Sequence, residues 1–307
     1  MRICSLLPSA TEILFELGAG ESVAGVTFEC DYPPEARTKR VVVRTRLEHS
    51  EDPLEIDRQV SDFVSRGESL YEIDQAALQA IDPDLIITQD LCHVCAASPG
   101  DLASVLAALA RKPEVLSLNP HSLRDVWKDI LAVGSAIGRS DPARELVTKL
   151  ERRVSAVVQA AAHFSAQPRV ACLEWLDPLF AGGHWVPEMV ACAGGADIFG
   201  KAAQPSFRLT WDELVKANPD VVVMMPCGYG LEQAVKEFNR VTLPEQWGSL
   251  RAVSDGRVFA VDGSGYFSRP GPRLAGGVEI LASILHSEEA PAAPPAASFA
   301  NVARTTQ

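Results

Sequence analysis

The chain carries one short pattern twice. Residues 78–89 read LQAIDPDLIITQ and residues 214–225 read LVKANPDVVVMM. Each copy predicts the end of an amphipathic helix, a Pro-Asp turn and an unbroken apolar strand. Pro83 and Pro219 lie nearly half a chain apart, whereas solenoid repeats recur about every 20–50 residues. The pattern therefore predicts two lobes of similar build, and a cleft between two domains is a preferred place for a small ligand.

The composition restricts the class of partner. A chain of 307 residues fits two domains, and 47% apolar with 22% charged residues is typical of a globular protein with sizeable cores. The net charge of −12 and a pI near 5.0 argue against nucleic acid, whose phosphates attract basic surfaces. No apolar run approaches the roughly 18–20 residues of a membrane span. We expect a monomer that binds a small molecule, with no nucleic-acid partner and no membrane insertion.

The first residues do not match a secretory signal peptide. The apolar stretch after the first positive charge is interrupted by Pro8 and ended by Glu12, so the usual run of about 7–15 apolar residues is missing. Cys4 lies too near the start to be the anchored cysteine of a lipoprotein. We expect Arg2–Leu7 to be the first strand. As written the protein is expected in the cytoplasm, and a true start further upstream would make it periplasmic.

Strand and helix patterns alternate along most of the chain. This alternation, with apolar strands of the buried type, predicts an α/β fold whose parallel sheets are covered on both faces. Ser9 with Glu12 predicts a capping box at the start of the first helix. Residues 40–70 are charged and weakly periodic, which predicts surface loops with a short helix near 55–65.

The alternation is interrupted by a long helical segment. Apolar residues recur at helical spacing from Val126 to Ile137 and again from Leu146 to Val158, with a break at residues 138–142. Helical connectors hold their span, so we expect this one to be rigid and the lobes to move little. The predicted division is an N-terminal lobe at 1–121, a connector at 122–164, a C-terminal lobe at 165–286 and a disordered Pro/Ala-rich tail at 287–307.

The candidate site residues follow from the expected fold. In open α/β sheets, ligands bind beyond the carboxyl ends of the strands. The residues that follow the predicted strands include Ser9, Phe28, Glu29, Gln89, Cys92, Cys95, Trp175, Trp185, Tyr229, Tyr266, Phe267 and Arg269. This set is rich in aromatic residues and poor in paired catalytic groups, so it suits a large flat apolar ligand. The alternative for any one aromatic residue is that it caps the core of its lobe.

Cys92 and Cys95 form a C-x-x-C pair after a predicted strand, which is typical of a redox pair or half of a metal site. The sequence has no second C-x-x-C and no H-x-x-x-H partner, so a structural zinc site is not expected. Inert packing of both thiols and a ligand-contacting role stay open. Seven cysteines spread thinly over the chain do not form a disulfide framework, and most are expected to be reduced core thiols.

Nucleotide and hydrolase signatures are absent from the sequence. It contains no G-x-G-x-x-G, no G-x-x-x-x-G-K-[ST] and no G-x-S-x-G. We therefore predict no catalytic residue and no catalytic cofactor, and the metal content stays open.

These pieces together resemble the cobalamin and iron-chelate substrate-binding proteins of ABC importers, and the cobalamin-binding members most closely. The resemblance spans roughly residues 2–286. It rests on the order and spacing of LLPSATEI (6–13), VAGV (23–26), DYPPEA (31–36), PDLI (83–86), CAGG (192–195) and FSRPGPR (267–273).

The resemblance implies two α/β lobes joined by a long helix, as in class III periplasmic binding proteins, with cobalamin or a related corrinoid in the cleft. It implies ligand contacts for Ser9, Phe28, Glu29, Gln89, Trp175, Tyr266, Phe267 and Arg269. Secreted members also dock on an ABC permease through an acidic residue on each lobe, and the matching regions hold Asp101 and Asp212. The permease would be a partner only of an exported protein.

Two departures from the secreted pattern leave other functions open. The segment QDLCHVC and the missing export signal favour relatives that stay inside the cell. One alternative is an intracellular enzyme of corrinoid or metal-chelate handling that uses Cys92 and Cys95, because thiolates bind soft metals well. Another is a binder of iron siderophores or haem, for which Arg208 and Arg269 could meet anionic groups.

Overall fold

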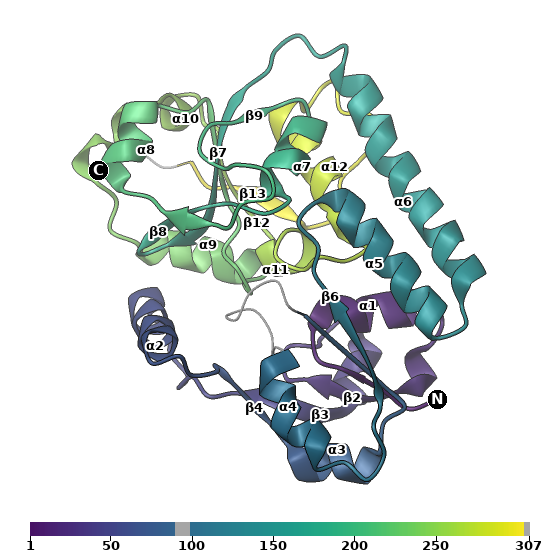
Figure 1. Ribbon diagram of the computed structural model, residues 1–307. Helices are drawn as coiled ribbons and strands as arrows, with labels where there is room; N and C mark the ends of the chain where they lie inside the picture. The colour runs from purple at the N-terminus through teal and green to yellow at the C-terminus, as the bar shows by residue number, and fades with distance from the viewer. Residues whose placement is uncertain (90–98, 304–307) are drawn as a thin grey trace. The chain divides into compact units, whose positions relative to one another are not determined.

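The computed structural model describes residues 1–89 and 99–303 (Figure 1). Contacts within the chain divide it into two compact units. Unit 1 comprises Met1–Pro120 and Arg124–Lys149, and unit 2 comprises His121–Leu123 and Leu150–Gln307. The segment predicted as a connector, 122–164, is divided between the units, with Arg124–Lys149 in unit 1 and the rest in unit 2.

Unit 1 is built on a mixed sheet. Its strands are β1 (Ile3–Ser5), β2 (Val23–Thr27), β3 (Arg40–Thr45), β4 (Tyr71–Ile73), β5 (Leu85–Gln89) and β6 (Glu114–Leu118). Among the described residues the order is β4-β3-β2-β1-β5-β6. All neighbours are parallel except β4, which pairs antiparallel with β3.

The helices of unit 1 are α1 (Pro8–Glu16), α2 (Pro53–Ser65), α3 (Gln75–Ile81), α4 (Pro99–Ala107), α5 (Leu123–Ala136) and the first half of α6 (Ser140–Ala161). Strand and helix side chains such as Val42, Leu78 and Leu102 share one buried cluster. The helix predicted near 55–65 is confirmed as α2. The loop predicted at residues 40–45 is wrong, because Val42 and Val43 are fully buried in β3 between charged neighbours.

Unit 2 holds the second sheet. Its strands are β7 (Arg169–Leu176), β8 (Leu179–Ala181), β9 (Ala196–Asp197), β10 (Phe207–Arg208), β11 (Val221–Met224), β12 (Val258–Val261) and β13 (Phe299–Asn301). In the described part of the chain the order is β10-β8-β7-β11-β12-β13, with β9 also pairing with β7. The strands β7, β11 and β12 are parallel, and β8, β10 and β13 pair antiparallel with their neighbours.

The α/β class is confirmed, but both sheets are mixed rather than purely parallel. Residues 177 and 178 alone separate β7 from β8, and so short a connection can join only antiparallel strands. Antiparallel strands lie at the edges of both sheets, while the central strands keep the parallel pairing expected from the alternation.

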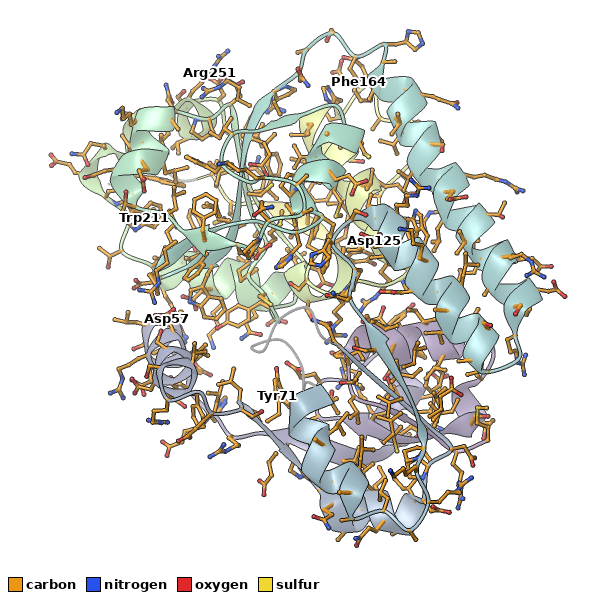
Figure 2. All side chains as sticks on the ribbon, in the orientation of Figure 1. Asp57, Tyr71, Asp125, Phe164, Trp211 and Arg251 are labelled. Carbon is orange, nitrogen blue, oxygen red and sulfur yellow. The ribbon has the colours of Figure 1, made fainter. Side chains whose placement is uncertain are left out.

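The helices of unit 2 are α7 (Val186–Cys192), α8 (Trp211–Ala217), α9 (Leu231–Arg240), α10 (Arg251–Ser254), α11 (Gly263–Tyr266) and α12 (Leu274–Leu285), with the second half of α6. Trp247 is fully buried, and its ring lies 5.8 Å from those of Phe238 and Trp211. Figure 2 labels Trp211 at the start of α8. These aromatic side chains pack one end of the core of unit 2.

The repeated pattern corresponds to the same local structure in both units. The helices α3 and α8 each end on a residue in the left-handed conformation, Asp82 (φ 47°) and Asn218 (φ 45°). The Asp of each Pro-Asp turn then accepts a hydrogen bond from the backbone N–H at the start of the neighbouring strand, at 2.6 Å for Asp84 and 2.9 Å for Asp220. The strands β5 and β11 follow directly. The repeat thus specifies a helix end, a turn and a parallel strand pair in each unit.

The C-terminal segment contains a strand. The prediction of disorder for 287–307 is wrong for β13, which pairs antiparallel with β12, with Phe299 opposite Val261. The rings of Phe299 and Phe259 lie 6.0 Å apart, and Ser298 is buried. The Pro/Ala-rich composition does not predict this strand, because β13 forms only by pairing with the edge of β12, which lies elsewhere in the chain.

Candidate functional site

The carboxyl edge of the sheet in unit 1 gathers the candidates that follow β1, β2 and β5. Phe28 and Glu29 follow β2, and Gln89 ends β5. Phe28 is 41% exposed, Glu29 is half-buried and Gln89 is buried. Because these strands are parallel, their carboxyl ends meet at one edge, as predicted.

Ser9 lies at the same edge, inside the first turn of α1. The predicted capping box is wrong, since Leu7 is the N-cap and Pro8 occupies the first helical position that proline prefers. The Ser9 hydroxyl is buried and makes no hydrogen bond with the described residues. A buried hydroxyl without a partner is costly, so this atom is a candidate for a ligand contact.

A buried polar network supports the turn after β2. The Thr11 hydroxyl donates to Ser5 Oγ at 2.8 Å and contacts Cys30 Sγ at 3.1 Å. Cys30 Sγ also lies 3.4 Å from Thr27 Oγ1, which accepts a hydrogen bond from the backbone N–H of Glu29 at 3.2 Å. These bonds tie β1, α1 and β2 together, so the backbone that presents the exposed aromatic ring of this turn is fixed.

The carboxyl edge of the sheet in unit 2 brings aromatic residues together. The rings of Trp175, near the end of β7, and Tyr229, after β11, lie 5.3 Å apart and are tilted by 59°. The Tyr229 carbonyl accepts a hydrogen bond from the backbone N–H of Ser264 in α11 at 2.9 Å. The end of β7 and the segments that follow β11 and β12 therefore meet at this edge of the sheet.

The remaining aromatic candidates differ in exposure. Phe267 is 2% exposed, and Trp185 is also buried, with its indole N–H donating to the Phe267 carbonyl at 2.7 Å. Their observed role is packing, and ligand contact at these two residues stays a prediction. Tyr266 is half-buried with the Arg273 guanidinium 5.7 Å from its ring, and Arg269 is half-buried.

Glu174 organises the neighbouring backbone, and its sequence context gave no signal of this. One carboxylate oxygen accepts a hydrogen bond from the backbone N–H of Gly183 at 3.2 Å, and the other accepts one from the Ser206 hydroxyl. A carboxylate on a β-strand is ordinary in sequence. Only the fold shows that it joins β7 to the two loops around β8 and β10.

The buried thiols of Cys4 and Cys172 are unreactive near neutral pH. Burial raises the pKa of Cys4 to about 12, and it raises the pKa of Cys172 well above its ordinary value, with smaller contributions from Asp197 and Glu174. The thiolate is the reactive form, so neither residue is a nucleophile near neutral pH. No group of three or more His, Cys, Asp or Glu side chains suited to a metal ion occurs among the described residues.

Some predicted residues lie outside the described part of the chain. Cys92 and Cys95 belong to segment 90–98, so their predicted roles stay predictions. The side chain of Asp101 is also outside it, whereas Asp212 is exposed in the first turn of α8. Within residues 1–89 and 99–303, none of the helices has both the length and the apolar character needed to cross a membrane.

Comparison with known proteins gives one family. The model of the periplasmic binding protein family matches residues 3–264. An uncharacterised ABC transporter substrate-binding lipoprotein of Bacillus subtilis is 26% identical over 94% of this chain and 80% of its own. The vitamin B12-binding protein of Photorhabdus laumondii is 24% identical over 93% of this chain and 88% of its own.

Solved structures share the fold. A periplasmic haem-binding protein of Pseudomonas aeruginosa superposes with a TM-score of 0.75 at 17% identity and covers 100% of this chain and 99% of its own. The periplasmic vitamin B12-binding protein of Vibrio cholerae superposes with a TM-score of 0.69 at 21% identity over 92% of this chain and 96% of its own. At these identities the likeness establishes the architecture alone.

Proposed function

Because the chain belongs to the periplasmic binding protein family, we propose that the ligand of this ABC transporter substrate-binding protein is cobalamin or a related corrinoid. The family consists of binding proteins that deliver a small molecule to an ABC transporter, so the protein is not an enzyme. Vitamin B12-binding proteins that match more than nine-tenths of the chain support a corrinoid among the ligands of the family.

The observation that carries the proposal is the aromatic pair of Trp175 and Tyr229. The two rings lie 5.3 Å apart and are tilted by 59° at the carboxyl edge of a parallel sheet, so the buried Tyr229 ring packs beside and supports the Trp175 ring. Trp175 is only half-buried, so part of its indole is accessible to a ligand. The Trp175 indole N–H already donates to the Asp177 carbonyl at 3.0 Å, which fixes the orientation of the ring. A pre-oriented ring loses little side-chain entropy when it packs against a corrin.

The edge of the sheet in unit 1 has candidate ligand contacts of its own. An exposed Phe28 ring and the unpartnered hydroxyl of Ser9 supply one apolar and one polar group. A corrin ring has an apolar rim and peripheral amides, and both kinds of group match that chemistry. We further propose that Asp212, exposed on α8, takes part in docking on the permease of the transporter.

Visible absorption tests the ligand class. The purified protein is mixed with cyanocobalamin or hydroxocobalamin, desalted, and its spectrum compared with that of free corrinoid. A retained corrinoid band at equimolar amounts supports the proposal. A protein that releases all corrinoid but retains haemin would contradict it and identify haem as the ligand.

A variant pair tests the aromatic surface. Trp175→Ala is expected to weaken corrinoid binding about tenfold, since loss of one stacking ring costs about 1.4 kcal/mol. Phe207→Ala removes another exposed ring, on β10, and serves as the matched control with unchanged affinity. Equal affinities for the wild type and Trp175→Ala would remove this ring from the site.

A further inference from the structure

The helix α2 is inserted at the tip of an antiparallel strand pair in unit 1. The pair β3–β4 continues to Thr45 opposite Tyr71, and the backbone N–H of Arg46 donates to the Leu70 carbonyl at 2.8 Å. Beyond this point the chain leaves the sheet and forms α2. Figure 1 shows α2 clear of the other helices of unit 1, and Figure 2 labels Asp57 on the helix and Tyr71, the first residue of β4.

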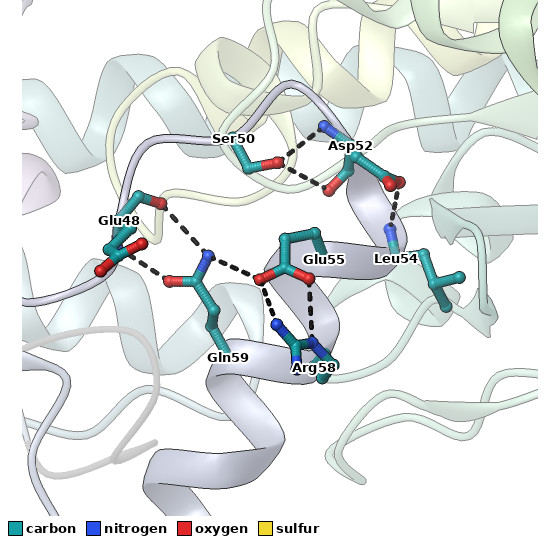
Figure 3. Close-up of polar contacts among 7 residues, drawn as sticks. All are labelled: Glu48, Ser50, Asp52, Leu54, Glu55, Arg58 and Gln59. Atoms are coloured by element: carbon teal, nitrogen blue, oxygen red, sulfur yellow. Dashed lines mark hydrogen bonds and ion pairs between the residues drawn. The ribbon is translucent and has the colours of Figure 1, made fainter.

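Hydrogen bonds and ion pairs within its own segment hold α2 (Figure 3). Asp52 caps the helix, its Oδ1 accepting a backbone hydrogen bond at 3.0 Å. Arg58 donates to both carboxylate oxygens of Glu55 at 2.9 and 2.7 Å. Gln59 accepts a hydrogen bond from the backbone N–H of Glu48 at 2.8 Å. The helix therefore keeps its shape without a packed core beneath it.

An apolar stripe on α2 is not buried. Ile56, Val60, Phe63 and Val64 follow helical spacing and lie on one side of the helix. Pro53 is the one buried residue of α2, and Val64 is 54% exposed while the other three are half-buried. The guanidinium groups of Arg46 and Arg66 lie 4.9 and 5.1 Å from the Phe63 ring and cover part of the stripe, and the remaining apolar area is available to a contact partner.

The segment that contains the stripe begins at the carboxyl edge of the sheet in unit 1, where the candidate ligand-binding residues lie. The strands β1, β2 and β3 are parallel, and the backbone N–H of Phe28 donates to the Val43 carbonyl at 3.1 Å. The residues of β3 that follow Val43 lead directly into the segment of α2. Phe28 and α2 thus follow two adjacent parallel strands, β2 and β3, at the carboxyl edge of the sheet.

The size of the stripe fits a small molecule better than a protein. Ile56 to Val64 spans about 12 Å at the rise of an α-helix. Four such side chains offer on the order of 200–300 Å² of apolar surface, whereas a stable protein–protein interface buries about 800 Å² on each partner. A ring ligand of macrocycle size needs no more than this area on one side.

We propose that the apolar stripe of α2 contacts the bound ligand and covers the apolar rim of its macrocycle. This inference rests on the proposed function, because it takes a corrinoid as the occupant. The helix then acts as a flap of unit 1, continuous with the surface that begins at Phe28.

Substitutions on α2 test the contact, with hydroxocobalamin as the probe. Ile56→Gln and Val60→Gln are each expected to weaken binding about tenfold, since each removes a buried aliphatic contact in the complex. Leu54→Gln is the matched control, because Leu54 is 53% exposed on the same helix but outside the stripe. Ile56 and Val60 are only half-buried, so the variants should stay folded with an unfolding midpoint close to that of the wild type.

Limited trypsin digestion gives an independent readout. Arg58 and Arg66 are exposed on and just after α2, and saturating hydroxocobalamin should slow cleavage at both while cleavage at exposed Arg144 on α6 is unchanged. Corrinoid binding that is equal in all variants, with no protection at Arg58, overturns the role of α2 and leaves the proposed function standing. A wild type that binds no corrinoid rejects the proposed function and this inference with it.

Discussion

The carboxyl group of Asp129 should make the stability of unit 1 depend on pH. Asp129 lies on α5, and its Oδ2 is buried without a hydrogen-bond partner among the described residues. Burial, with a smaller contribution from Asp125, raises the pKa of Asp129 from 3.8 to about 7, and Lys128 opposes this. The folded state therefore binds the proton more tightly than the unfolded state.

The sign and size follow from this difference. A raised carboxyl pKa gives stability that is fully present below the unfolded pKa and is lost as the pH rises through the folded pKa of about 7. The full difference corresponds to about 4 kcal/mol at about 1.36 kcal/mol per pKa unit. Because the group is partly solvated, we expect about half of it, roughly 2 kcal/mol.

Urea unfolding of the wild type and Asp129→Asn at several pH values measures the effect. At about pH 8 the variant should be more stable by roughly 2 kcal/mol, because it carries no buried charge. Below about pH 4 the two proteins should agree, since Asp129 is then protonated in both states. Asp141→Asn, at a side chain that is 82% exposed, is the control with no such difference. Parallel stability profiles for the wild type and Asp129→Asn across this range would refute the reasoning.

Four further substitutions test the packing of unit 2 by urea unfolding. Arg153 donates to Glu279 at 2.8 and 2.6 Å, and Arg153→Ala should cost about 2–3 kcal/mol, more than Glu279→Ala, because Glu279 is the less exposed partner at 9%. Equal decreases in the free energy of unfolding for Arg153→Ala and Glu279→Ala would contradict the idea that an unpaired Glu279 is the more costly of the two. Trp247→Ala should lower the free energy of unfolding by about 3–5 kcal/mol, because it opens a cavity in the core. A decrease under about 1 kcal/mol would show that neighbouring side chains move to fill the cavity. Gly277→Ala places a methyl group against the Tyr266 carbonyl and should cost about 1–3 kcal/mol, and an unchanged midpoint would show that α11 moves freely.

Local patterns predicted the helices and the central strands. The Pro-Asp repeat predicts structure well because it specifies three consecutive local features. These are a helix that ends on a residue in the left-handed backbone conformation, a turn whose Asp carboxylate accepts a hydrogen bond from a neighbouring backbone N–H, and a buried strand. Each part is determined by residues adjacent in sequence. The edge strands β4 and β13 are different, because a short segment becomes a strand only where another strand offers free backbone groups.

The candidate residues were selected only to the level of the sheet edge. The rule that ligands bind at the carboxyl ends of parallel strands selected Trp175 and Tyr229, and the structure places their rings 5.3 Å apart. It could not separate the half-buried Trp175 from Tyr229, Trp185 and Phe267, which are aromatic residues in similar loops but are buried. Exposure depends on which loops cover which rings, and that is decided by long-range packing. The role of Glu174 was invisible for the same reason, because Ser206 lies far along the chain.

The position of β13 has a consequence for any shortened form of the protein. A chain that stopped after α12 would leave the backbone N–H and C=O groups along one side of β12 without partners, next to the uncovered ring of Phe259. Exposed edge strands pair readily with strands of other molecules. Residues 298–302 therefore cover this edge of the sheet and protect it against self-association, although their composition resembles a dispensable tail.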